Sequence, residues 1–135
     1  MGQVADYIQQ IYLTEETNCA EALFRAALTA RRKNVPNECY RMMSGYSGGV
    51  SCEDICGAVL GGVAAISYLI NQGDEESFER SKEATVAFVE LCRQDFNTIN
   101  CHDIKTVWRT EERRCFQAVE KMAGMLEEIL RKYRV

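Results

Sequence analysis

The 135-residue sequence has almost no alternation of apolar and polar residues, and it contains a single proline, Pro36. Alternation is typical of half-buried β-strands, so its scarcity argues against a sheet. Apolar residues recur instead at the three- and four-residue spacing of amphipathic helices. We therefore expect an all-α fold, with one compact domain over residues 1–135 built as a bundle of five or six helices.

A basic surplus is also missing, because 16 lysines and arginines face 20 acids and give a net charge of -4. This balance disfavours nucleic acid as a partner. The first residues, "MGQVADYIQQIY", lack the basic start and apolar run of a secretory signal, so we expect a cytoplasmic location. The central apolar run, Ile55–Ile70, is shorter than the roughly 20 residues of a membrane-spanning helix, and no membrane insertion is expected.

Familiar catalytic motifs are absent as well: there is no phosphate-binding P-loop, no HExxH and no distinguishable Ser-His-Asp set. The only histidine is His102, which we expect to be exposed. The remaining chemistry-bearing residues are seven cysteines. In a reducing compartment this density indicates metal binding or redox chemistry more than structural disulfides. Some cysteines are expected to be small core residues, an interpretation we favour for Cys39 and Cys92.

Periodicity and capping residues predict where the helices lie. Asn18 is a good N-cap for the second helix, and Thr110 is a good N-cap for the last one. Ser51 followed by Asp54 resembles a capping box that would open the central helix. The short element after Cys101 is left open between a turn and a helix. The expected helices cover residues 4–12, 19–30, 38–43, 51–71, 78–96 and 110–133. The buried face of the fifth is expected to carry Phe78, Thr85, Phe88, Val89, Cys92 and Phe96, and that of the last Cys115, Val119, Met122, Leu126, Ile129 and Tyr133. The charged run Arg109–Arg114 is expected to be a solvated helix start.

The most informative stretch is "GYSGGVSCEDICGAVLGG", from Gly45 to Gly62. If the helix begins at Ser51, Cys52 and Cys56 lie four residues apart on one face, with Cβ atoms about 5–6 Å apart. That spacing is too wide for an unstrained disulfide and is easier for two thiolates that share a metal. The glycines that follow Cys56 each cost roughly 1 kcal/mol in a helix, so they must make room for another helix or for a cofactor.

Two Asn-Cys pairs, Asn18-Cys19 and Asn100-Cys101, place a cysteine directly after a predicted N-cap. Free amide N–H groups and the helix dipole stabilise negative charge at this position. We therefore expect the pKa of both thiols to be lowered, which would favour the thiolate that attacks disulfides and binds metals.

Taken together, these segments resemble the C_GCAxxG_C_C family of small redox-active proteins. The resemblance is carried by "NCAEALFRA" at Asn18–Ala26, "SGYSGGVSCEDICGAVLGG" at Ser44–Gly62, "INCHDI" at Ile99–Ile104 and a last cysteine, Cys115. The family signature corresponds to Cys19, Cys56, Cys101 and Cys115, with Gly57, Ala58 and Gly61 completing the central motif. Cys39, Cys52 and Cys92 lie outside the signature, and the segment after Cys101 is shorter than usual. The resemblance implies an α-helical fold and thiol- or cofactor-based redox chemistry.

The leading hypothesis is that Cys19, Cys56, Cys101 and Cys115 converge on one site. Four thiolates would suit an iron–sulfur cluster or zinc. The turn at Gly48 and Gly49 would bring backbone amides to the sulfurs, and Gly57 and Gly61 would provide room beside a cofactor.

Two other hypotheses remain open. In one, no metal is present: Cys56 is the nucleophile, and one of Cys19, Cys101 or Cys115 resolves the mixed disulfide. In the other, the protein is a non-catalytic helical binding or assembly module whose cysteines are core residues. The sequence does not identify a redox partner, and it leaves association with a second copy of the chain open.

Overall fold

The computed structural model describes residues 2–135, which form seven α-helices and no β-strand. This confirms the all-α class and corrects the expected number of five or six helices. The additional helix follows Cys101, where Asn100 accepts a hydrogen bond from the backbone N–H of Asp103 at 3.1 Å and starts a regular helix rather than a turn. The helices are α1 (Val4–Ile8), α2 (Cys19–Ala30), α3 (Asn37–Arg41), α4 (Gly57–Ile70), α5 (Glu75–Phe96), α6 (Cys101–Trp108) and α7 (Phe116–Lys132).

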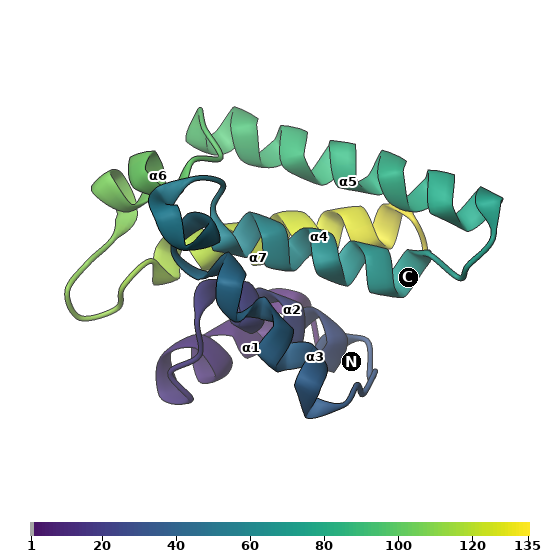
Figure 1. Cartoon of the computed structure of the whole chain (residues 1–135), viewed down its shortest axis with the longest axis horizontal. Coiled ribbons are helices and arrows are strands. Elements are labelled where there is room, and N and C mark those ends of the chain that lie inside the picture. The colour runs from purple at the N-terminus through teal and green to yellow at the C-terminus, as the bar shows by residue number, and fades with distance from the viewer. Residues whose placement is uncertain (1) are drawn as a thin grey trace.

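Three long helices make up one side of the molecule and the shorter ones complete it (Figure 1). Helices α4, α5 and α7 run lengthwise, α1 to α3 lie along one side of them, and α6 lies at one end. Helix α4 contacts α2, α5 and α7, which explains why its sequence is apolar nearly all round rather than on one stripe.

Two glycines of α4 allow its neighbours to approach closely. A Cβ atom built on Gly61 would collide with the backbone carbonyl of Ala20 in α2. A Cβ atom on Gly62 would lie 2.6 Å from the ring of Phe88 in α5. At Gly61 and Gly62 the room is therefore taken by other helices.

The central helix begins later than predicted. Residues 49–53 form a separate wide turn in which Val50 and Ser51 have left-handed φ values of 57° and 61°. The next segment then pairs with the residues before α6: Cys56 N–H donates to the carbonyl of Ile99 at 2.7 Å, and Ile55 forms an antiparallel bridge with Asn100. This extended pairing keeps the segment out of the helix, so Cys56 is the N-cap of α4 and the predicted capping box at Ser51 is wrong.

The last helix also begins later than predicted. Thr110 and Arg114 close a turn, in which the Thr110 N–H donates to the Arg114 carbonyl at 2.8 Å, and the helix starts only at Phe116. The segment 109–114 is not simply a solvated helix start, because Arg114 reaches inward to the carbonyls of Tyr12 and Thr17.

On α5 the buried face is rotated from the predicted one. Phe78 is 48% exposed, whereas Ser77 and Ser81 are buried along with Phe88 and Cys92.

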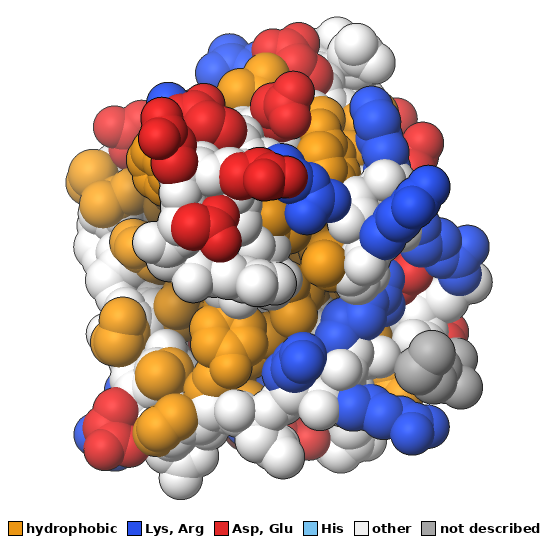
Figure 2. All heavy atoms as spheres, turned by 90° about the vertical axis from the view of Figure 1, so that its right-hand side faces the viewer, with side chains coloured by type: hydrophobic (Ala, Val, Ile, Leu, Met, Phe, Trp, Pro, Cys, Tyr) orange, Lys and Arg blue, Asp and Glu red, His pale blue; other side chains and the backbone are white. Residues whose placement is uncertain are grey.

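Exposed apolar side chains are not rare on this protein; besides Phe78 on α5, Tyr68 on α4 is another. Figure 2, which shows the right-hand end of Figure 1, has a band of apolar side chains between an acidic upper part and a basic right edge.

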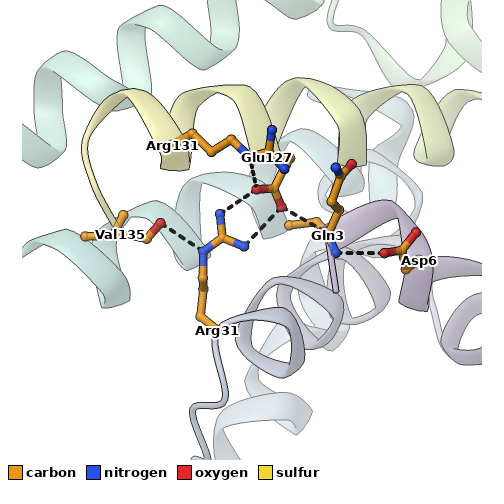
Figure 3. A network of polar contacts seen from close by, with 7 residues as sticks. Gln3, Asp6, Arg31, Glu127, Arg131 and Val135 are labelled. Carbon is orange, nitrogen blue, oxygen red and sulfur yellow. Dashed lines mark hydrogen bonds and ion pairs between the residues drawn. The ribbon is translucent and has the colours of Figure 1, made fainter. Parts of the chain in front are cut away.

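The ends of the described chain are joined by a buried ion pair (Figure 3). The Glu127 carboxylate, 6% exposed, accepts hydrogen bonds from the Arg31 guanidinium at 2.8 and 3.0 Å and from the Val4 N–H at 3.0 Å. Arg31 also donates to the carbonyl of Val135 at 2.9 Å. These bonds connect α1, α2 and α7 at positions that the sequence pattern did not single out.

Candidate functional site: four cysteines at helix starts

Each cysteine of the family signature lies at the start of a helix. Cys19 is the first residue of α2 and Cys101 the first residue of α6. Cys56 is the N-cap of α4 and Cys115 the N-cap of α7. Cys115 therefore begins the last helix and does not belong to its apolar stripe, where the sequence predicted it. All four are free thiols.

The sulfur of Cys19 lies directly against the backbone of α4. A Cβ atom on Gly57 would be 2.7 Å from Cys19 Sγ and equally close to the carbonyl oxygen of Tyr46. Because Gly57 follows Cys56, the starts of α2 and α4 bring these two cysteines together. The room provided by Gly57 is thus occupied by a thiol of the site itself.

The extended pairing before α6 brings Cys101 to the same place. Cys101 N–H donates to the carbonyl of Asp54 at 2.6 Å, two residues before Cys56. On an antiparallel pair, residues in this diagonal relation have their Cβ atoms roughly 7–8 Å apart, on the same face. Gly49 packs on the other side, where a Cβ atom would collide with Cys101 Cβ.

The pKa values of Cys19, Cys56 and Cys101 are each affected by other thiols of this set. Burial raises the pKa of Cys19, and the charges of Cys115 and Cys101 raise it further. Burial also raises the pKa of Cys56 to about 12, with Cys19 as the next cause and Cys101 a smaller one. The pKa of Cys101 is raised first by burial and then, among other groups, by Cys115. Cys19 and Cys101 each couple to all three others.

The prediction of lowered pKa values at the two Asn-Cys pairs is wrong. Both asparagines are N-caps as predicted, with Asn18 accepting from the Glu21 N–H at 2.8 Å. The pKa of Cys19 and of Cys101 is nevertheless raised, because removing a thiolate from water costs more than the helix start returns.

Several backbone amides partly offset the effect of burial on the pKa values of these thiols. The backbone amides of Gly48 and Ala20 lower the pKa of Cys19. Those of Val59 and Ala58 lower the pKa of Cys56 in the same way. Gly48 has a left-handed φ of 66°, so the glycine-rich turn does direct an amide at a sulfur of the site.

Cys101 has a different environment, because its counteracting groups are cations. Lys105 and Arg109, one and two turns further along, lower its pKa. Lys105 is held in place by an ion pair with Glu53 at 2.7 Å, and His102, which is exposed as expected, pairs with the same carboxylate at 3.1 Å.

The three remaining cysteines differ from one another. Cys52 is exposed on the wide turn and does not share a helical face with Cys56, so the expected four-residue helical spacing of this pair is wrong. Cys39 is half-buried in α3. Cys92 is fully buried, as predicted for a core residue, but its pKa is raised to about 12 by burial and then by Cys56. It is a fifth thiol behind the site.

Two residues of the site carried no signal in the sequence. Tyr12 is 2% exposed, and its hydroxyl accepts a hydrogen bond from the Cys115 N–H at 3.2 Å. The guanidinium of Arg114 lies over its ring, 4.0 Å from the centroid. Neither belongs to a motif, and their sequence separation of about a hundred residues gives no periodic pattern that could have pointed to the contact.

The types of side chain in the site and their arrangement lead to different expectations about metal binding. Four soft thiolate ligands suit zinc or an iron–sulfur cluster. Within residues 2–135, however, no group of three or more His, Cys, Asp or Glu side chains is arranged to hold a metal ion. None of the helices in this part of the chain is long and apolar enough to cross a bilayer.

The fold and the site define a class: a small all-α protein with one buried and three half-buried cysteines at the starts of four helices. The chain belongs to the C_GCAxxG_C_C family, whose model, described as "Putative redox-active protein (C_GCAxxG_C_C)", matches residues 17–129. The match contains all four cysteines of the site. No curated protein and no solved structure is significantly similar to the chain.

Proposed function

We propose that this protein exchanges electrons with a partner's disulfide through its own thiols, with Cys19 as the common resolving cysteine. The observation that carries the proposal is the coupling of Cys19 to Cys56, Cys101 and Cys115 at one place, together with the contact of its sulfur with Gly57. Thiol–disulfide exchange needs thiols that can reach one another in turn, and Cys19 and Cys101 are the two that couple to all the others.

Cys101 is the best candidate for the first attack. The thiolate is the attacking species, and access to it limits the rate. Lys105 and Arg109 favour the thiolate at Cys101, which is only partly buried. Cys56 is 8% exposed and has a pKa of about 12, so it is less suited than Cys101 to make the first attack.

The exchange balances without a metal. The Cys101 thiolate attacks one sulfur of the partner's disulfide, forms a mixed disulfide and releases the other sulfur, which takes up a proton. Cys19 then attacks Cys101 Sγ, releases the partner's second sulfur and closes a Cys19–Cys101 disulfide. The partner gains two electrons and two protons, and the two cysteines lose them.

Burial of the sulfurs decides whether the Cys19–Cys101 dithiol/disulfide couple is reducing or oxidising. A disulfide is neutral, whereas a thiolate in an apolar site is costly. Raised thiol pKa values leave the reduced form without the stabilisation that makes a dithiol protein strongly oxidising. We therefore expect a reducing couple, one that donates electrons to disulfides more readily than it accepts them.

A second candidate is an iron–sulfur cluster or zinc held by Cys19, Cys56, Cys101 and Cys115. The observation that favours it is the set of amides acting on the sulfurs of Cys19 and Cys56, because such amides tune thiolate ligands. When bound, a cluster would supply one-electron transfer, and the helix starts would stabilise its negative charge.

One experiment separates the two candidates. The protein is purified anaerobically, and iron, sulfide and zinc are measured per chain before and after reconstitution. Metal-free protein is then oxidised with glutathione disulfide at graded ratios to glutathione, quenched with acid and mapped by mass spectrometry. The thiol proposal expects a disulfide between Cys19 and Cys101 in metal-free protein.

Single Cys→Ser variants identify which cysteine attacks and which one resolves the mixed disulfide. Cys19→Ser should trap glutathione on Cys101, Cys101→Ser should prevent that adduct, and Cys39→Ser should behave as wild type. Absence of any disulfide among the four cysteines would contradict the thiol proposal. Stoichiometric metal lost in all four single Cys→Ser variants would establish the second candidate instead.

A further inference from the structure

Among the residues that the structure describes, Tyr12 is the one phenol buried against the cysteine site. It lies in the wide helical turn that follows α1, and its side chain reaches the start of α7 about a hundred residues later. Its ring is 2% exposed, and Cys115 and Cys19 are the two thiols whose charges it feels. The hydroxyl is therefore placed beside the half of the site formed by Cys19 and Cys115.

The hydroxyl oxygen of Tyr12 accepts a hydrogen bond, but the hydroxyl proton is not donated to any group of the described residues. The oxygen accepts from Cys115 N–H at 3.2 Å, which fixes the N-cap residue of α7. Within residues 2–135 the proton has no hydrogen-bond acceptor in this reduced state of the site, because no bond donated by Tyr12 Oη is formed. Burying a hydroxyl with an unused proton is unfavourable unless the proton finds an acceptor in another state.

Arg114 holds the ring in place. Its guanidinium lies 4.0 Å from the ring centroid and donates to the carbonyls of Tyr12 and Thr17, so the cation is fixed over the phenol. A cation at this position makes the phenol a stronger hydrogen-bond donor. Burial raises the pKa of Tyr12 to about 12, which keeps the proton on the oxygen at neutral pH.

Building on the thiol function proposed above, we propose that Tyr12 is a positioning residue that donates its hydroxyl hydrogen bond to the thiolate formed at Cys115 or Cys19 during exchange. The ring anchored by Arg114 and the bond from Cys115 N–H place the oxygen at the Cys115 backbone, and Cys19 is the other thiol whose charge acts on Tyr12. Rotation about the C–O bond would direct the proton to the thiolate that carries charge. The hydroxyl gives up no proton in this step; it stabilises the charge until the exchange is complete.

The test is Tyr12→Phe, which keeps the ring and its contact with Arg114 and removes only the hydroxyl. The matched control is Tyr40→Phe, because Tyr40 is also buried and also stacks with an arginine, Arg25 at 3.7 Å, but lies in α3, whereas the four cysteines of the site are at the starts of other helices. Alkylation rates of each cysteine are measured by mass spectrometry in the reduced protein, along with the midpoint potential against glutathione. One hydrogen bond to a charged group corresponds to about a 10-fold change in rate.

We expect Tyr12→Phe to slow alkylation of Cys115 and Cys19 by about 10-fold and to make the midpoint potential more negative, with Cys39 unchanged. Tyr40→Phe should leave all of these rates unchanged. Equal rates and potentials in folded Tyr12→Phe and wild type would overturn the inference. If Tyr12→Phe does not fold, Arg114→Gln provides the second test, because it weakens the donor and keeps the hydroxyl; it should slow the same two cysteines.

The two proposals fail in different ways. If wild type forms no disulfide on oxidation, the thiol function itself is wrong. If wild type forms the disulfides and Tyr12→Phe reacts and titrates against glutathione identically, only the role of Tyr12 is wrong.

Discussion

The sulfur of Cys19 occupies the space that a side chain on Gly57 would need. The distance from Cys19 Sγ to a Cβ atom at position 57 would be 2.7 Å, well inside van der Waals contact. The Cys-Gly of the central motif is therefore a packing requirement of the site: the glycine after Cys56 allows a second thiol to lie beside the start of α4. The same helix then uses Gly61 to accept the backbone of Ala20, one residue after Cys19.

Gly57→Ala should destabilise the protein, because both neighbours at 2.7 Å, a sulfur and the Tyr46 carbonyl, would have to move. Overpacking of this kind costs about 1–3 kcal/mol of the free energy of unfolding. Urea denaturation of the reduced protein measures it. The control is Gly124→Ala in α7, where a Cβ atom meets nothing within 4 Å and the helix should gain about 1 kcal/mol. Equal stability of the two variants would contradict the packing argument.

In the folded, reduced protein, the alkylation rate of each cysteine should be lower the more deeply its thiol is buried. Cys56, with a pKa of about 12, should react with iodoacetamide at pH 7–8 at least about 100-fold more slowly than exposed Cys52. The rate at Cys56 should still be rising at pH 10, since the thiolate fraction increases tenfold per unit below the pKa. Unfolding in urea should bring both rates together. A native Cys56 that reacts as fast as Cys52 would show that the site is open to solvent.

Stability should fall in alkali. The pKa values of Cys56 and Cys92 are raised from 9.0 to about 12, so the folded protein keeps protons that the unfolded chain loses. The unfolded state binds fewer protons between these values, and the free energy of unfolding therefore decreases as pH rises above about 9. Urea titrations of reduced protein from pH 7 to 10.5 measure the slope. Cys92→Ala should flatten it relative to wild type, whereas Cys39→Ala should not; equal slopes in all three would refute the assignment.

The Glu127–Arg31 pair should produce the opposite dependence in acid. The pKa of Glu127 is lowered to about 2; burial alone would raise it, but hydrogen bonds from Arg31 and Val4 prevail. Its stabilisation is complete above the unfolded value of about 4.5 and is lost as pH falls toward 2. Glu127→Gln should cost about 1–3 kcal/mol at pH 7 and flatten the acid limb of the unfolding curve. Glu128→Gln, at the exposed neighbouring position, is the control and should leave both unchanged.

Much of the fold could be predicted from local pattern. The periodicity of Val119, Met122, Leu126 and Ile129 identified the buried face of α7, and Asn18 identified the start of α2. The errors lie where long-range contacts override local signals. Ser51 and Asp54 resemble a capping box, yet pairing of Ile55 with Asn100 holds the segment extended and delays α4 to Gly57. Phe78 is predicted on the face of Phe88, yet it is 48% exposed: at 3.6 residues per turn it lies about 80° round the helix from Phe88, whereas buried Ser77 and Ser81 lie within about 20° of it.

For the site, the residues themselves establish the chemistry: seven cysteines, four of them in the order and context of the C_GCAxxG_C_C family, and glycines that had to make room for something. Residue types and spacings identify which atoms are present and, at Asn18 and Asn100, where a helix begins. Long-range packing gives the room at Gly57 to Cys19, places Tyr12 against Cys115, and raises the pKa values of Cys19 and Cys56. The physical reason is that helix capping acts within one turn of the chain, whereas burial depends on what every other helix places around the sulfur.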